Sequence, residues 1–240
     1  MEYRVARIPK GKGKFRYIHI ASEKDNLQLR SLIPELERIL EESDSCKVNY
    51  AFQRDKNCAL NALQHIGYRY TLSMDLENFF DSISPEHVAD LIPDLIIRQC
   101  FVDGNPKQGL PTSPIITTIA FFHCDQKIIE TLNKLNISAV YTRYADDLIF
   151  SFNDSKVEGK IRFIVKQIVE RNGFKVNEKK TKLQDSKNGR VIITGIAVDN
   201  RGLYATRRTK KKIRAAIHQN NENSLIGLNE WSKCKLPLAI

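Results

Sequence analysis

The sequence contains little of what marks membrane, repeat or linker-rich proteins. Its 240 residues include only 11 glycines and 8 prolines, and the absence of internal repeats and low-complexity stretches argues against repeat architectures and long flexible linkers. No run approaches the roughly 18 consecutive apolar residues of a membrane span, and residues 1–4 form no apolar signal core. We therefore expect a cytoplasmic protein with no membrane partner.

Cysteines are few, odd in number and widely spaced. No pair stands in a Cys-x-x-Cys arrangement, so neither a disulfide framework nor a zinc site is expected. The five thiols are interpreted as packing residues: Cys46, Cys58, Cys100, Cys124 and Cys234.

The composition is that of a globular protein with a strong positive charge. Hydrophobic residues make up 42% and charged residues 28%, which argues against long disorder. The 38 Lys and Arg residues exceed the 28 Asp and Glu residues, giving a net charge of +10. Such a balance favours polyanionic partners, and charge alone leaves nucleic acid and an anionic membrane surface both open.

Hydrophobic periodicity and turn signals predict a mixture of strands and helices. Helices are expected over 25–43, 57–67, 111–135 and 158–172, and from Ser84 and Thr206 onward. Strands are expected over 5–9, 15–20, 71–76, 139–144 and 148–152, with a strand pair around Gly189. Because strands interleave with helices and are joined partly by a hairpin, we predict an α+β domain with an antiparallel sheet.

Two adjacent aspartates, Asp146 and Asp147, lie in the predicted turn between two apolar strands. Like charges so close together repel and raise each other's pKa, and a divalent cation removes that cost. Asp75, which lies 71 residues earlier at the end of another apolar strand, is the candidate for a third carboxylate. Two Mg²⁺ ions about 4 Å apart could then activate an attacking 3′ oxygen and stabilise pyrophosphate. Taken alone, an Asp-Asp turn is more often an ordinary polar turn.

Three boxes in order make the chain resemble the reverse-transcriptase family over nearly its whole length. The residues Tyr144-Ala145-Asp146-Asp147 resemble the family's aspartate-pair box. The stretch 75–80 resembles its first carboxylate motif, and the stretch 108–114 resembles its glutamine-glycine-proline-serine motif. The resemblance implies a polymerase right-hand fold, with a palm built on an antiparallel sheet with packed helices. It places the fingers at 1–70, the palm at 71–200 with fingers helices interleaved around 85–110, and the start of a short basic thumb at 201–240.

The resemblance also implies roles for individual residues. Two Mg²⁺ ions, or Mn²⁺ in their place, would be bound by Asp75, Asp146 and Asp147, with the Leu76 carbonyl as a further ligand. Nucleotide-binding positions carried over from the family are Lys10, Arg16, Asn78, Phe79, Phe80, Gln108, Gly109 and Lys179. In this set Phe80 would be the steric gate against a ribose 2′-hydroxyl, with a core phenylalanine as the alternative, and Lys179 or Lys180 would protonate pyrophosphate.

The basic tail would begin the thumb. Its cations could lie along a nucleic-acid backbone, and the alternative is a solvated basic helix face. These cations are Arg207, Arg208, Lys210, Lys211, Lys212 and Arg214.

Two short signatures narrow the resemblance to bacterial retron-type enzymes. Asn61-Ala62-Leu63-Gln64-His65 is similar to the retron asparagine-alanine-x-x-histidine signature, and Ile193-Thr194-Gly195 is similar to the valine-threonine-glycine one. The resemblance implies deoxynucleoside triphosphates as substrates, a non-coding RNA as template and primer source, a DNA product, anti-phage defence and an effector protein as a further partner. A non-retron defence enzyme with protein-primed or untemplated synthesis, and a non-catalytic RNA-binding module, remain open.

Overall fold

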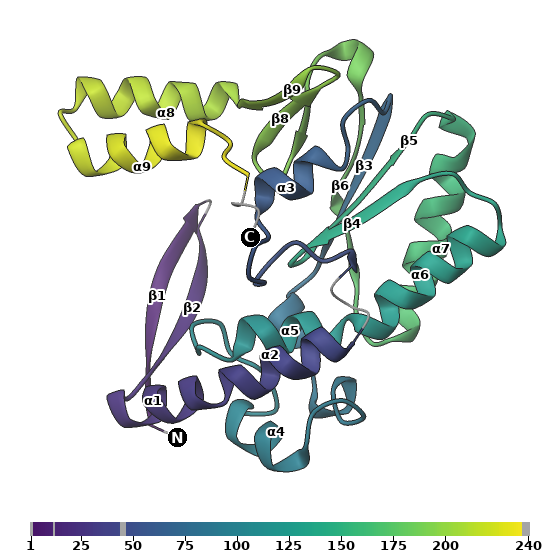
Figure 1. Ribbon diagram of the computed structural model, residues 1–240. Helices are drawn as coiled ribbons and strands as arrows, with labels where there is room; N and C mark the ends of the chain where they lie inside the picture. The colour runs from purple at the N-terminus through teal and green to yellow at the C-terminus, as the bar shows by residue number, and fades with distance from the viewer. Residues whose placement is uncertain (1, 12, 44–46, 237–240) are drawn as a thin grey trace. The chain divides into compact units, whose positions relative to one another are not determined.

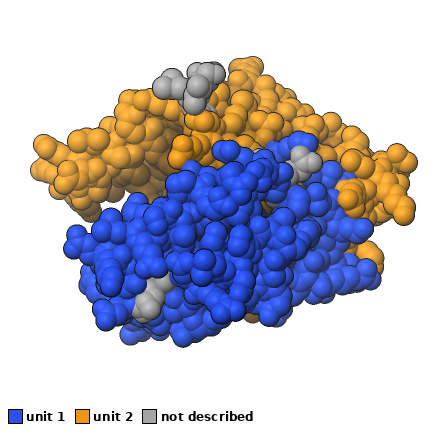
Figure 2. All heavy atoms as spheres, turned by 60° about the horizontal axis from the view of Figure 1, so that its bottom comes forward, with its two compact units in different colours: residues 1–47, 76–129, 166–175 blue, residues 48–75, 130–165, 176–240 orange. Residues whose placement is uncertain are grey.

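The computed structural model describes residues 2–11, 13–43 and 47–236 (Figure 1). Its chain divides into two compact units, which Figure 2 shows in different colours. Unit 1 consists of residues 1–47, 76–129 and 166–175. Unit 2 consists of residues 48–75, 130–165 and 176–240. The chain therefore passes from one unit to the other five times, so neither unit is a continuous stretch of sequence. The predicted fingers, palm and thumb borders do not coincide with this division.

Unit 1 opens with the predicted hairpin. Strands β1 (Tyr3–Gly11) and β2 (Lys14–Ala21) pair antiparallel and form a two-stranded sheet of their own. Two helices follow, α1 (Glu23–Ser31) and α2 (Ile33–Glu42), so the prediction of one helix over 25–43 was wrong. The chain breaks at Leu32 because Pro34, in the first turn of α2, has no amide hydrogen and clashes with the carbonyl four residues earlier.

The rest of unit 1 is helical and packs on aromatic rings. Its elements are η2 (Phe79–Ser82), η3 (Pro85–His87), α4 (Asp94–Cys100), α5 (Ser113–Ala120) and the first part of α6 (Phe122–Lys134). The predicted continuous helix over 111–135 is broken at Phe121, which is fully buried and whose ring lies 5.7 Å from Phe79 and 5.1 Å from Phe174. Burial of this ring therefore outweighs helix continuity. The helix expected from Ser84 is only the short η3 turn.

Unit 2 contains a four-stranded sheet in the order β4-β5-β3-β6. The strands are β3 (Tyr70–Leu76), β4 (Val140–Tyr144), β5 (Asp147–Phe152) and β6 (Val176–Asp185). Strand β5 pairs antiparallel with both β3 and β4, as the hairpin around the two aspartates predicts. The first residues of α7 (Glu158–Arg171), which follows the η4 turn (Ser155–Val157), also belong to this unit.

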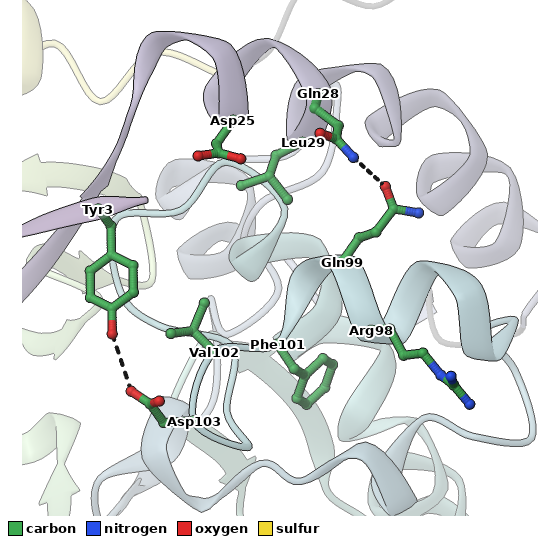
Figure 3. A pocket seen from close by; sticks show the side chains of 9 residues that line it. All are labelled: Tyr3, Asp25, Gln28, Leu29, Arg98, Gln99, Phe101, Val102 and Asp103. Carbon is green, nitrogen blue, oxygen red and sulfur yellow. Dashed lines mark hydrogen bonds between the residues drawn. The ribbon is translucent and has the colours of Figure 1, made fainter. Parts of the chain in front are cut away.

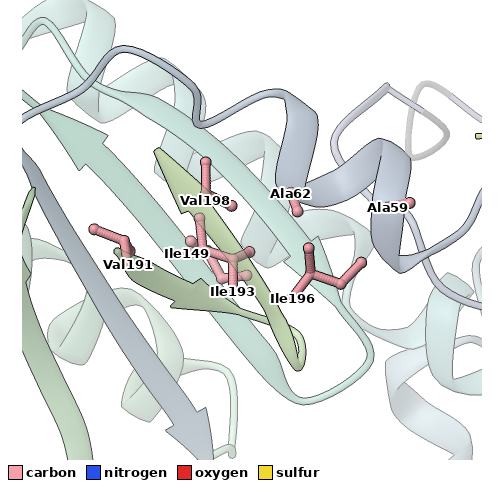
Figure 4. Close-up of a cluster of buried hydrophobic side chains, with 7 residues drawn as sticks. All are labelled: Ala59, Ala62, Ile149, Val191, Ile193, Ile196 and Val198. Atoms are coloured by element: carbon pink, nitrogen blue, oxygen red, sulfur yellow. The ribbon is translucent and has the colours of Figure 1, made fainter. Parts of the chain in front are cut away.

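A second, three-stranded sheet in unit 2 packs against helix α3 (Cys58–Leu63). Its strands are β7 (Val191–Ile193), β8 (Ile196–Asp199) and β9 (Gly202–Ala205), preceded by η5 (Ser186–Asn188). Figure 4 shows the apolar cluster between them: Ala59, Ala62, Ile149, Val191, Ile193, Ile196 and Val198. The strand pair predicted around Gly189 was wrong, since β6 and β7 belong to different sheets. Helix α3 also ends at Leu63, and turns continue to Gly67.

The C-terminal part of unit 2 is a helical hairpin of α8 (Arg207–His218) and α9 (Glu222–Ser232) (Figure 1). Helix α9 was not predicted. Its Trp231 lies against Gly195, where an added Cβ would be 3.3 Å from the indole.

Two sequence expectations concern absences. None of the described cysteines forms a disulfide, and Cys46 lies outside the described residues. In the described part of the chain, no helix is long and apolar enough to cross a membrane.

Candidate active site

The three predicted metal ligands meet at one end of the four-stranded sheet. Asp75 at the end of β3 is the direct register partner of Asp147 at the start of β5, and Tyr144 of β4 is the partner of Asp147 on the other side. Asp146 stands in the turn that joins β4 to β5. The turn begins at Ala145, whose φ of 55° is left-handed, so the chain reverses within two residues and keeps the two aspartates adjacent.

The environment of the Asp147 carboxyl opposes its ionisation. The pKa of Asp147 is raised to about 7, first by burial and then by the charges of Asp146 and Asp75, while the charge of Lys180 opposes the rise. Like charges this close to Asp147 repel it, so positive charge at this place would be stabilising.

Two residues of β6 contact the Asp75 carboxylate. The Lys180 Nζ lies 2.7 Å and 2.9 Å from the two carboxylate oxygens of Asp75, and the Asn177 amide donates to Asp75 at 3.2 Å. Residues three apart on a regular strand face opposite sides. Here the strand is irregular, since the Thr181 hydroxyl donates to the Asn177 carbonyl. Because of that irregularity, the sequence did not point to Asn177 and did not decide whether Lys179 or Lys180 lies at the site. Lys179 is exposed.

The donor types at this site suit a hard divalent ion. Three carboxylates offer oxygen ligands of the kind that Mg²⁺ prefers. As the side chains stand in the described ranges, no three acidic, His or Cys residues are placed to hold a metal ion, and the Lys180 ammonium contacts Asp75. The residues present therefore fit a metal chemically, with Lys180 as a cation already at the site.

The predicted nucleotide-binding residues lie in unit 1, apart from Lys179. Lys10 and Arg16 are exposed on the paired strands of the hairpin. Phe79 is 4% exposed within the aromatic core, whereas Phe80 is half-buried with its ring edge-on to Phe79 at 6.2 Å. Asn78 is exposed, with a left-handed φ of 46°, and Leu76 is buried.

The loop at Gln108 and Gly109 is held against strand β2. The His19 amide donates to the Gln108 carbonyl at 2.7 Å. A Cβ on Gly109 would lie 2.5 Å from the His19 carbonyl oxygen and 2.6 Å from Ile18, and its φ is +106°. Glycine is required here because the backbone of β2 comes so close, and the part of Gly109 in nucleotide binding stays a prediction.

A separate cavity of about 400 Å³ lies within unit 1 (Figure 3). The Tyr3 hydroxyl donates to Asp103 at 3.2 Å, and the Gln28 amide donates to Gln99 at 2.8 Å. None of its lining residues is a predicted site residue.

The six thumb cations lie exposed along α8. The buried side of this helix carries Thr209 and Ala216, so the cations occupy the solvent side. Thr194 of the short signature at 193–195 donates to the Cys58 carbonyl at 3.3 Å, which links β7 to α3.

Comparison with known proteins decides the family. The model of the family described as reverse transcriptase (RNA-dependent DNA polymerase) matches residues 8–196. The chain belongs to the reverse transcriptase family. The matched span covers all three predicted metal ligands.

The curated relatives are retron reverse transcriptases, so the chain is of retron type. It is 30% identical to the retron Ec73 reverse transcriptase of Escherichia coli, over 80% of this chain and 67% of the relative. It is 29% identical to the retron Ec86 reverse transcriptase of the same species, over 76% of this chain and 59% of the relative. It is 26% identical to the retron Mx65 reverse transcriptase of Myxococcus xanthus, over 88% of this chain and 54% of the relative. The chain thus spans between about half and two thirds of the length of these relatives.

Solved structures show the same reverse transcriptase fold. Telomerase from Candida albicans superposes with a TM-score of 0.62 at 15% identity, over 85% of this chain and 45% of that chain. A foamy viral protease-reverse transcriptase superposes with a TM-score of 0.56 at 20% identity, over 96% of this chain and 36% of that chain. The predicted α+β polymerase fold with fingers and palm is confirmed.

Proposed function

We propose that this chain carries the polymerase centre of a retron-type reverse transcriptase, which copies a partner non-coding RNA into single-stranded DNA. One observation carries the proposal: Asp75, Asp146 and Asp147 stand at one end of three adjacent strands, with Asp75 and Asp147 in direct register. Carboxylates crowded in this way are suited to holding divalent ions at the end of a growing strand.

The proposed metal ligands are the three aspartates, with the Leu76 carbonyl as a further oxygen. Two bound Mg²⁺ ions, or Mn²⁺ in their place, would activate the 3′ oxygen and stabilise the leaving pyrophosphate. Lys180, already hydrogen-bonded to Asp75, is the better placed of the two candidate lysines to hold a proton near the leaving group. Its pKa is raised, first by the hydrogen bond to Asp75, so it stays protonated at neutral pH.

Three further groups of predicted residues are proposed to contact nucleotide or nucleic acid. Lys10 and Arg16 would bind the triphosphate of a deoxynucleotide, the lysine through its single positive charge and the arginine through two parallel hydrogen bonds. The half-buried Phe80 would exclude a ribose 2′-hydroxyl. The exposed cations of α8 would lie along the phosphates of the duplex, where each contact adds salt-dependent affinity.

Cellular context is proposed from the retron relatives. A bacterial cytoplasmic enzyme that acts in anti-phage defence, together with an effector protein, would match the family resemblance. Loss of phage resistance on deletion of the gene would support this role, and unchanged resistance would contradict it.

The test of activity uses the protein together with its RNA. With Mg²⁺ and deoxynucleotides we expect DNA synthesis, and the double substitution D146A/D147A should reduce it about a thousandfold or more, because charge stabilisation of several kcal/mol is lost. The matched control is Asp90→Ala, an exposed aspartate that pairs with His123, and it should retain activity. Synthesis that persists in the double variant would overturn the proposal. A product without an RNA–DNA junction would favour a non-retron defence enzyme.

A further inference from the structure

A single buried histidine connects three strands of the carboxylate-bearing sheet. His65 is 3% exposed. Its Nδ1 lies 2.8 Å from the Ser151 hydroxyl of β5, and its Nε2 lies 2.7 Å from the Thr142 hydroxyl of β4. The Ser151 hydroxyl is in turn 2.8 Å from the Thr71 hydroxyl of β3. One imidazole ring thus lies within a chain of hydrogen bonds that runs from Thr71 of β3 through Ser151 of β5 to Thr142 of β4.

This polar chain and the carboxylates share one face of the sheet. Thr71 and Ser151 are register partners, as are Asp75 and Asp147 four residues further along. Residues an even number apart on a strand face the same side, so the two pairs lie on one face about 13 Å apart at ~3.3 Å per residue. The hydroxyl partners of the histidine therefore lie behind the carboxylates, with Ser151 four residues from Asp147 and Thr142 in register with Ile149, two residues from Asp147.

The chain just before His65 packs on the apolar cluster of unit 2. His65 follows α3, whose Ala59 and Ala62 pack with Ile149 of β5 in the apolar cluster of Figure 4. Ile149 lies between Asp147 and Ser151 and faces the same side as both. Moving the ring would therefore disturb the cluster as well as the hydrogen bonds.

The chemistry of the ring suits a fixed support. Burial lowers the pKa of His65 to about 3, so the imidazole is neutral at physiological pH. In the neutral ring one nitrogen donates and the other accepts, and both find hydroxyl partners. A fully satisfied buried network of this kind fixes one arrangement of the strands that it joins.

We propose that His65 is a positioning residue which sets the spacing of the ends of β3, β4 and β5, and through them the separation of the carboxylates of Asp75 and Asp147. This inference rests on the proposed function, because it assumes that the carboxylates bind metal. The positioning role would explain the histidine of the 61–65 signature, to which the proposed function assigns no role. A metal site is sensitive to the groups that orient its ligands, and loss of such groups weakens binding.

The experiment titrates the purified full chain with Mn²⁺ and follows the free ion by electron paramagnetic resonance. Relative to the wild type, His65→Phe should raise the Mn²⁺ dissociation constant about tenfold, the lower end of the range for supporting groups. His65→Gln, whose amide offers one donor group and one acceptor, should recover most of the affinity. Thr142→Val and Ser151→Ala each remove one partner of the ring. Both should also raise the Mn²⁺ dissociation constant, and they replace His65→Phe in the experiment if that variant does not fold.

A second histidine provides the matched control. His87 in unit 1 also has both ring nitrogens engaged, with Ser84 at 2.9 Å and the Asn172 carbonyl at 2.9 Å. His87→Phe should lower the melting temperature, as loss of the His65 contacts does, and leave the Mn²⁺ dissociation constant unchanged. An unchanged constant in His65→Phe, or an equal rise in His87→Phe, would overturn the positioning role.

The same titration separates the two proposals. A wild type that binds Mn²⁺ but makes no DNA would contradict the proposed function and leave the effect of His65 on metal binding measurable. An active wild type whose His65 variants bind Mn²⁺ normally would contradict only the positioning role. A wild type without Mn²⁺ binding would contradict both.

Discussion

The two regions that carry the predicted site residues are held in place by different means. In unit 2, side chains fix the carboxylates: Lys180 and Asn177 contact Asp75, and His65 ties the strands behind it. In unit 1, the hairpin is exposed along most of β1 and the first half of β2. Its anchor to the Gln108 loop is a backbone hydrogen bond and a close approach at Gly109.

This difference separates the expected effects of substitution. In the proposed polymerase centre, side chains that touch the carboxylates would act where bonds form and break, so substitutions in unit 2 should change kcat. A backbone anchor sets where the hairpin cations stand, so changes in unit 1 should appear in the KM for nucleotide or in selectivity.

The largest effect is expected at Lys180. Replacing it by leucine removes the ammonium beside Asp75, and kcat should fall about a hundredfold, as when a general acid is lost. Single-turnover incorporation measures this rate directly. The control is Lys179→Leu, which changes an exposed neighbour of the same type and should leave kcat nearly unchanged. Equal losses in the two variants would show that the distinction between them is wrong.

Next in size is the effect of Gly109→Ala. The new Cβ would meet the β2 backbone in an already left-handed conformation. A strain of about 2 kcal/mol expressed in nucleotide binding corresponds to a KM about thirtyfold higher.

Steady-state kinetics with varied deoxynucleotide would measure this KM, with kcat expected to change little. Gly104→Ala is the control, since Gly104 also has a left-handed φ, +78°, but open space around its missing Cβ. If both variants raise KM equally, conformational strain alone explains the effect and the β2 contact does not matter.

The smallest effect is expected at Phe80. Replacing it by alanine should reduce discrimination against ribonucleotides about tenfold, a size typical of one pocket contact, while deoxynucleotide incorporation continues. Competition between a deoxynucleotide and its ribonucleotide measures the ratio. Phe79→Leu changes the neighbouring core ring and should lower stability without changing selectivity. Unchanged discrimination in Phe80→Ala would make Phe80 a core residue only.

The sequence was sufficient to predict the meeting of Asp75, Asp146 and Asp147. A hairpin keeps adjacent residues at its turn, and strand alternation with apolar neighbours puts Asp75 at the end of a paired strand. Both rules depend only on residues close together in the sequence, so the sequence around the carboxylates was enough to apply them.

Features that depend on distant contacts were not predictable in this way. The break at Phe121 follows from burial against Phe79 and Phe174, and Gly109 is required by a strand about 90 residues earlier in the chain. The irregularity of β6 that brings Lys180 to Asp75 leaves no clear pattern of hydrophobic residues. Each of these depends on tertiary packing, which overrides local preference.

The interleaving of the two units also bears on how the protein is made. Unit 1 includes residues 166–175 and unit 2 continues past residue 176, so neither can be completed while only the first half has left the ribosome. Contacts between residues far apart in sequence slow folding, and incomplete chains expose apolar surface. The nascent chain is therefore expected to depend on chaperones until about three quarters of it has been synthesised. A cut at any single point within residues 48–175 would leave neither unit whole.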